Sequence, residues 1–229
     1  MQSSGVAAVP IPAFPREGGL AKNHHGGRAS LRERVRPATQ AELDGVPWLH
    51  ALSSAERARA QSAMVVGDAE PGDLVCRVGR SPTYWFGEGT AMKREPYRYD
   101  IQALRKSVVA GLPIDDFHWL LDHSIGFNRF VMNQLNERLA QFIAARENDR
   151  LNNPDARVAR NLAQLFNPVL FPGVGELLRI TQQELAYLVG LSRQRVNEAL
   201  HTLQERGAIA VEYGGVRVLD LEALRNGGA

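Results

Sequence analysis

The chain has 229 residues, 44% of them apolar, and a net charge of +2, which is enough for one large domain or two small ones. Its single cysteine, Cys76, excludes an intramolecular disulfide, a four-cysteine zinc site and a cysteine-ligated iron–sulfur cluster. We find neither a membrane-spanning apolar run nor a signal-peptide pattern, so we expect a cytoplasmic protein.

Residues 1–40 hold the excess positive charge, with six Lys and Arg against two acidic residues. They are rich in Pro, Gly and Arg and contain few large apolar residues, which is typical of a disordered tail. His24 and His25 are adjacent there, but in a glycine-rich tail we interpret them as solvated histidines and not as a metal pair.

Residues 41–116 alternate short helical and strand-like patterns. "WLHALSSAERARAQ" predicts a short helix with a cap near Ser53, and "AMVVGDAEPGDLVCRVG" predicts two strands around a Pro-Gly turn. "YRYDIQALRKSVVAGLPI" predicts further strands. We therefore expect a small antiparallel sheet domain in this range.

Residues 117–151 form the longest helical pattern. Its apolar residues recur three or four positions apart and so share one face, which Met132 and Ile143 widen. The residues of this face are Phe127, Val131, Leu135, Leu139 and Phe142. A face this broad indicates a helix that packs both on its own domain and on a second copy of the chain, and a buried core helix is the alternative.

Residues 152–229 begin with a helix that has Pro154 in its first turn, followed by "TQQELAYLVGLSRQRVNEALHTLQERG". Thr181 and Glu184 have the spacing of a capping box, Gly190 can end that helix, and Ser192 can cap the next one. Two short helices separated by one glycine are typical of a helix-turn-helix.

The second of these helices is amphipathic. Val196, Ala199, Leu200 and Leu203 fall on one face, while polar residues occupy the other. Arg can pair with guanine, Gln and Asn with adenine, and Glu can accept from cytosine, so we predict a DNA-reading surface. The predicted DNA-binding residues are Thr181, Gln182, Ser192, Arg193, Gln194, Arg195, Asn197, Glu198 and His201.

"AIAVEYGGVRVLD" then predicts two strands joined by Gly214-Gly215. Helix, turn, helix and hairpin in this order predict a winged helix-turn-helix domain that binds double-stranded DNA. A helical hairpin that only packs is the alternative interpretation.

The segment "ITQQELAYLVGLSRQRVNEALHTLQERGAIAVEYGGVRVLDLEALR" resembles the DNA-binding domain of the Crp-Fnr family of bacterial transcription regulators. The resemblance implies an α+β fold made of an N-terminal antiparallel β-roll, here partial, a long dimerisation helix and a C-terminal winged helix-turn-helix. It implies a homodimer, and it implies RNA polymerase as a further partner. Many members begin the recognition helix with Ser-Arg-Glu and have another Arg four residues after that Glu. Arg193 matches this pattern, whereas Gln194 and Glu198 depart from it.

"FGE" at Phe86–Glu88 resembles the start of the family's phosphate-binding cassette. The resemblance implies that Glu88 contacts a ribose and Arg98 a phosphate, although Tyr99 follows where the family often has Ser. Several strands that normally separate "TYWF" from "FGE" are missing, so we expect a shortened β-roll that binds cyclic AMP poorly or not at all. We expect no metal site and no other cofactor.

Two other classes of function compete with a DNA-binding regulator. The first is a ligand-binding or protein-binding module whose winged domain makes protein contacts only. The second is an enzyme, but "GEGTAM" lacks the third glycine of a dinucleotide fingerprint, and His118 and His123 flank "WLLD" as packing residues. We find no catalytic constellation and predict that the protein is not an enzyme.

Overall fold

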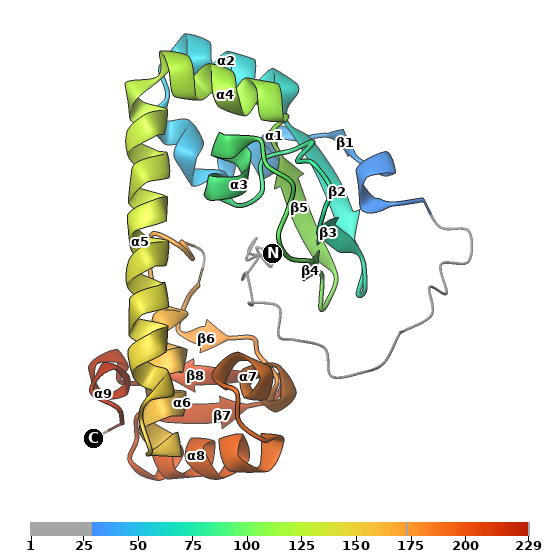
Figure 1. Ribbon diagram of the computed structural model, residues 1–229. Coiled ribbons are helices and arrows are strands. Elements are labelled where there is room, and N and C mark those ends of the chain that lie inside the picture. Colours follow the sequence, from blue (N-terminus) through green and yellow to red (C-terminus); the bar gives the residue numbers. More distant parts are fainter. Residues whose placement is uncertain (1–28, 173, 229) are drawn as a thin grey trace. The chain divides into compact units, whose positions relative to one another are not determined.

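Residues 29–172 and 174–228 are described by the computed structural model of the protein (Figure 1). They form two units that divide within one long helix, α5 (Ile125–Asp149), after Leu135. We call them the N-terminal unit and the C-terminal unit. Most of the predicted tail, including His24 and His25, lies outside the described residues.

The N-terminal unit alternates short helices with short strands. In chain order its elements are η1 (Leu31–Glu33), β1 (Arg36–Pro37), α1 (Gln40–Asp44), η2 (Pro47–Ala51), α2 (Ser54–Ala63), β2 (Val65–Ala69), β3 (Leu74–Cys76), α3 (Glu88–Lys93), β4 (Ile101–Gln102), β5 (Ser107–Gly111), α4 (Ile114–His123) and the start of α5. Its strands form two antiparallel sheets, β1-β2-β5 and β3-β4. These sheets confirm a partial antiparallel β-roll, and Figure 1 shows β2 and β5 side by side.

Residues 29–40 are not a tail, contrary to the prediction. Arg36 and Pro37 pair with Val66 and Val65 as the edge strand β1, and Leu31 is buried. Leu31 packs against Gly67 of β2, where its side chain fills the space that a larger residue would need. This ordering depends on contacts with a strand about thirty residues away, which local composition does not reveal.

An aromatic cluster forms the core of the N-terminal unit. The rings of Trp48 and Phe127 are 5.4 Å apart, and Trp85 lies 5.0 Å from Phe117 and 5.4 Å from Phe127. Phe127 is fully buried here, and Val131 is 1% exposed. The prediction that these two residues contact a second chain is therefore wrong, because the cluster of their own unit already covers them.

The single helix predicted from Phe117 onward is two helices, α4 and α5. Ser124 breaks them with an extended backbone at φ −117° and ψ 110°. Its hydroxyl accepts a hydrogen bond from the Phe127 amide at 3.2 Å, which caps the start of α5. Ser124 is a capping residue type and Gly126 follows it, but the apolar periodicity runs through both, so the periodicity alone did not reveal the break.

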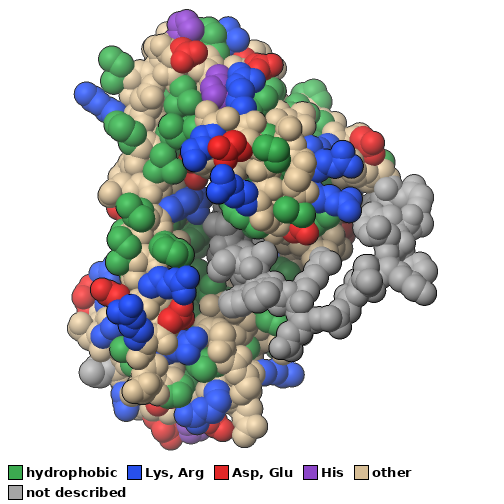
Figure 2. Space-filling view, in the orientation of Figure 1, with side chains coloured by type: hydrophobic (Ala, Val, Ile, Leu, Met, Phe, Trp, Pro, Cys, Tyr) green, Lys and Arg blue, Asp and Glu red, His purple; other side chains and the backbone are tan. Residues whose placement is uncertain are grey.

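The later part of α5 carries exposed apolar side chains. Met132, Leu139, Phe142 and Ile143 are each more than half exposed, and Leu135 is partly buried. Green side chains are visible along this helix in Figure 2. The outward face of α5 is thus Met132, Leu139, Phe142 and Ile143, with Leu135 at its edge, partly packed on the core; it differs from the predicted face at its N-terminal end.

The C-terminal unit contains the end of α5 and a compact α/β arrangement. Its further elements are α6 (Pro154–Gln164), β6 (Leu177–Leu178), α7 (Gln182–Val189), α8 (Arg193–Glu205), β7 (Ile209–Glu212), β8 (Gly215–Val218) and α9 (Leu221–Arg225). The strands form an antiparallel sheet in the order β6-β8-β7. α8 packs against α6 and α7. Within the described ranges, no helix combines the length and apolar character needed to cross a bilayer.

Candidate nucleic-acid interface

The first helix of the predicted pair, α7, has the expected ends. The Thr181 hydroxyl accepts from the Glu184 amide at 3.1 Å, and the Thr181 amide donates to the Glu184 carboxylate at 2.8 Å. Gly190 ends the helix in the left-handed region at φ 65°, and a side chain there would meet Arg157 Nη2. A glycine is therefore required for this turn, and the turn sets the direction in which α8 begins.

The second helix, α8, is anchored by one apolar face. Ser192 accepts from the Arg195 amide at 3.2 Å and so caps its N-terminus. Val196, Ala199, Leu200 and Leu203 are all at most 1% exposed. Burial of this face fixes the helix rigidly, and the opposite face is left to solvent, as the sequence predicted.

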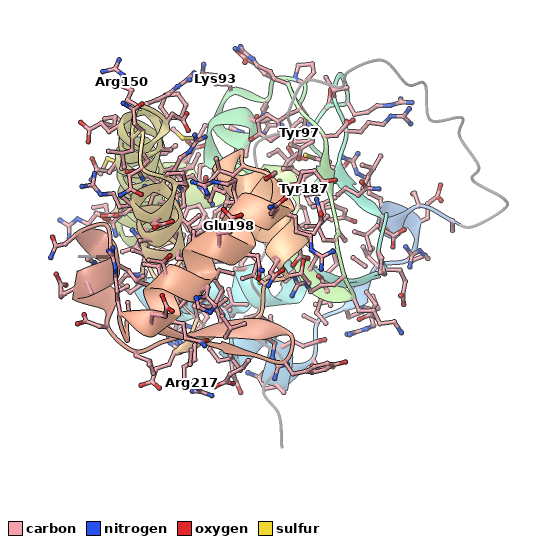
Figure 3. All side chains as sticks on the ribbon, turned by 90° about the horizontal axis from the view of Figure 1, so that it is seen from below. Lys93, Tyr97, Arg150, Tyr187, Glu198 and Arg217 are labelled. Carbon is pink, nitrogen blue, oxygen red and sulfur yellow. The ribbon has the colours of Figure 1, made fainter. Side chains whose placement is uncertain are left out.

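The exposed face of α8 presents the predicted polar side chains together. Of the predicted DNA-binding residues, Gln182 is partly buried and the remaining eight are exposed: Thr181, Ser192, Arg193, Gln194, Arg195, Asn197, Glu198 and His201. Charged side chains of both signs gather at this end of the C-terminal unit in Figure 2, and Figure 3 labels Glu198 midway along α8.

Hydrogen bonds organise this face before any partner binds. Gln182 Nε2 donates to Asn197 Oδ1 at 2.8 Å, which ties α7 to α8. Gln194 Nε2 donates to Glu198 Oε1 at 3.2 Å, and Arg195 forms an ion pair with Glu198. The side chains that could meet base edges are thus held in defined directions, an arrangement that suits direct readout.

A two-residue hairpin joins β7 to β8 beside the helices. Glu212 pairs with Gly215, so the turn consists of Tyr213 and Gly214 and not of Gly214-Gly215 as predicted. Gly215 belongs to the strand because it pairs with Glu212, and it is a glycine because a Cβ there would lie only 2.6 Å from the Leu178 carbonyl oxygen of β6. Close approach of a neighbouring strand, rather than turn geometry, is the reason for this second glycine.

The hairpin tip contributes a residue that the sequence did not single out. Tyr213 is fully exposed at the turn. Behind it, Arg217 Nε donates to Glu212 Oε1 at 2.5 Å, and this bond lowers the pKa of Glu212. A cavity of about 210 Å³ separates the hairpin from α7 and is lined by Thr181, Gln182 and Val211, among others. The sequence signal that could have identified Tyr213 is an aromatic residue next to the glycines of a short hairpin turn.

The two predicted cyclic-nucleotide residues have different surroundings. Glu88 is buried at the start of α3, whereas the Arg98 side chain is 77% exposed and pairs with Glu95 at 2.9 Å. One cavity in the N-terminal unit measures about 40 Å³, has mostly apolar walls and is lined by neither residue. Since one water needs about 10–15 Å³, this cavity can hold a few waters but not a nucleotide.

The residues considered for enzyme chemistry have structural contacts. His118 Nε2 lies 3.0 Å from the Ala91 carbonyl oxygen, and His123 stacks on Trp119 with ring centroids 4.5 Å apart. "GEGTAM" opens the short helix α3. No cluster of three or more His, Cys, Asp or Glu side chains suited to a metal occurs within residues 29–172 and 174–228.

Comparison with known proteins places this architecture in a family. A family model described as the Crp-like helix-turn-helix domain matches residues 156–226. The transcriptional regulator LdrP, from each of two strains of Thermus thermophilus, is 30% identical over 147 residues, which cover 62% of this chain and 71% of that protein.

Solved structures have the same fold. FixK2 from Bradyrhizobium japonicum matches with a TM-score of 0.57 at 11% identity, over 72% of this chain and 98% of that one. TTHA1359, a Crp/Fnr regulator from Thermus thermophilus, matches with a TM-score of 0.50 at 22% identity, over 72% and 97%. The protein belongs to the Crp-Fnr family and is a transcription regulator with a C-terminal helix-turn-helix DNA-binding domain.

Proposed function

We propose that this regulator reads specific DNA sequences as a homodimer, with α8 in the major groove. The observation that carries the proposal is the division of α8 into two faces. One is apolar and fully buried, and the other is polar and exposed over the same length of helix. A rigidly seated helix with outward hydrogen-bonding groups is what major-groove readout requires.

The roles of the nine residues follow from their positions. Arg193 lies in the first turn of α8, where a recognition helix meets base edges. Gln194, Asn197, Glu198 and His201 extend the reading surface along the helix. Thr181 and Gln182 open α7 at the helix end suited to a phosphate, while Ser192 caps α8 and Arg195 flanks its exposed face.

The homodimer is proposed from the outward face of α5. Met132, Leu135, Leu139 and Phe142 follow one another at intervals of three, four and three residues. This is the spacing of apolar positions in a coiled coil. Met132, Leu139 and Phe142 are exposed, while Leu135 packs in part on its own core, and exposed apolar side chains at that spacing favour burial against a second copy. Ile143 widens the contact at its C-terminal end.

The domain roles are proposed accordingly. Residues 41–116 form the shortened β-roll, 117–151 contain the dimerisation helix, and 152–229 form the DNA-binding domain. The protein acts in the cytoplasm, where its DNA target is, by binding rather than by catalysis. RNA polymerase is the proposed protein partner, since a transcription regulator must either contact the polymerase or keep it from its promoter.

Cyclic AMP is proposed to bind weakly or not at all. A charge-assisted bond to a phosphate is strong where water is excluded. Arg98 is largely exposed and already paired with Glu95, and neither Arg98 nor Glu88 lines the small apolar cavity found in the N-terminal unit.

Binding assays with DNA of selected sequence test the proposal. A site is first selected from random DNA with the purified protein, and its affinity is measured at several salt concentrations. Arg193→Ala is expected to weaken specific binding by ~1–3 kcal/mol without changing the fold. Arg225→Ala is the matched control, because Arg225 is exposed on α9 and pairs with Glu222.

The alternative function, a module whose winged domain contacts proteins only, gives a different result. Contacts with DNA phosphates release counterions, so affinity for DNA must fall steeply with salt. Failure to select any site, or equal effects of the Arg193 and Arg225 variants, would argue for the alternative.

A further inference from the structure

An acidic side chain lies in the middle of the surface that is proposed to face DNA. Glu198 is 44% exposed, midway along α8 (Figure 3). A carboxylate near DNA phosphates is electrostatically unfavourable, because the duplex carries one negative charge per ~1.7 Å of its length. Glu198 therefore needs a compensating partner and, if it reads DNA, a matching donor on a base.

The compensating partner lies one turn away on the same helix. Arg195 forms an ion pair with one carboxylate oxygen of Glu198, and Gln194 Nε2 donates to the other at 3.2 Å. Residues three and four positions apart face each other on a helix, so both contacts follow from the spacing. Arg195 offsets the charge of the carboxylate, and the two contacts together restrict its orientation.

The constrained carboxylate still has acceptor capacity. Each carboxylate oxygen can accept about two hydrogen bonds, and Arg195 and Gln194 occupy one on each. In the major groove, cytosine presents an amino donor at N4, whereas guanine presents the acceptors O6 and N7. A carboxylate can accept a hydrogen bond from cytosine N4 and is repelled by guanine O6 and N7.

We propose that Glu198 selects cytosine over guanine at one base pair of each half-site, and that Arg195 is a positioning residue that holds Glu198 for this task. The inference rests on the proposed function, in which α8 enters the major groove. It assigns different roles to the two arginines of the helix. Arg193 has no ion pair with any residue in the described part of the chain, so it is available to DNA, whereas Arg195 is committed to Glu198.

Site selection with variants of Glu198 provides the first test. The wild-type protein should select half-sites with cytosine at one constant position. The Glu198→Ala variant should prefer cytosine over guanine about 10-fold less than the wild type, at this position alone. It should also bind non-specific DNA more tightly, because a negative charge is removed. Glu198→Arg should shift the preference at the same position to guanine.

Arg195 is tested by a double-mutant cycle. If Arg195 positions Glu198, Arg195→Ala weakens discrimination at the cytosine position, and adding it to Glu198→Ala has no further effect there. If Arg195 instead contacts a phosphate, its removal weakens binding to all sequences equally and lowers the salt dependence, which overturns its positioning role. Circular dichroism and thermal melting establish that each variant is folded.

The outcomes separate this inference from the proposed function. The inference is overturned if the selected site shows no cytosine preference, or if Glu198→Ala selects the same site as the wild type. The proposed function survives either result as long as Arg193→Ala weakens specific binding. A wild-type protein that selects no site at all overturns both the inference and the proposed function.

Discussion

Arg193 and Arg195 are two positions apart on α8 and have the same side chain, but their surroundings differ. Arg195 is engaged by Glu198, whereas Arg193 projects from the first turn without an ion pair to any described residue. A charged group's contribution to binding depends on what it already contacts. At the scale of single residues, function in this protein therefore depends on neighbours as much as on residue type.

The thiol of Cys76 is expected to be unreactive in the folded protein. It is 1% exposed, beside Tyr97 and Ile101, and burial raises its pKa to about 11. Because the thiolate is the reactive form, a disulfide reagent at pH 8 should modify Cys76 at least ~10-fold more slowly in the native protein than in denaturant. Rapid modification of the native protein would contradict this and would make Cys76 a candidate redox sensor.

Glu42 is expected to make stability depend on acid pH. Hydrogen bonds from the Arg36 guanidinium at 2.7 and 2.9 Å, followed by one from the Thr39 amide, lower the pKa of Glu42 from 4.5 to about 2. A lowered pKa stabilises the fold above pH 4.5, and this contribution is lost as pH falls toward 2.

Glu42→Gln should therefore lower the free energy of unfolding at pH 6, and the deficit should shrink between about pH 4.5 and 2. Urea denaturation at a series of pH values measures it. A deficit that does not change with pH would show that the ionised carboxylate is not the source of the stabilisation.

At the scale of elements, α5 has two successive environments along one helix. Its first turns supply Phe127 and Val131 to the core of the N-terminal unit, whereas Leu139 and Phe142 further along are exposed. The apolar periodicity is continuous through both stretches. One pattern thus serves packing within the chain at one end and, in our proposal, packing between chains at the other.

Two phenylalanines of α5 provide a matched comparison. Phe127→Ala should lower the free energy of unfolding by ~3–5 kcal/mol, because it leaves a cavity in the aromatic cluster. Phe142→Ala should lower it by less than ~1 kcal/mol in a dilute sample, with an effect that depends on protein concentration if a dimer forms. Denaturation at two concentrations measures both, and equal losses for the two variants would contradict the division of α5.

At the scale of the molecule, one chain carries the helix proposed to read DNA in its C-terminal unit and the proposed dimer face on α5. A two-fold dimer presents two copies of α8 to the same duplex. Such a pair reads a near-palindromic operator whose half-sites lie about one helical turn apart, ~34 Å. The operator's symmetry is thus a consequence of the proposed assembly and not of α8 alone.

Changing the half-site spacing tests the assembly. Inserting about five base pairs, half a helical turn, places the half-sites on opposite faces of the duplex, and affinity should fall to that of a single half-site. Leu139→Glu together with Phe142→Glu should give the same low affinity for the original operator, with a monomer by sedimentation. Undiminished binding to the operator with the insertion would show that the two half-sites are not read by one rigid dimer.

The sequence by itself determined the features that depend on neighbours within a few residues. The capping box at Thr181, the left-handed Gly190, the cap at Ser192 and the buried face of α8 were all predicted, and the structure confirms them. Helix ends and helix faces follow from hydrogen bonds and periodicities over one or two turns. For the same reason, the order of helices and hairpin was enough to predict the winged domain.

Only the tertiary structure decided features that join distant segments. β1 is a strand because it pairs with β2, Phe127 is a core residue because Trp48 and Trp85 surround it, and Gly215 is a strand glycine because β6 passes beside it. Apolar periodicity identifies a face that must be buried but not the surface that covers it. Long-range contacts supply that information, and here they divided α5 between its own core and the surface that we propose for a second chain.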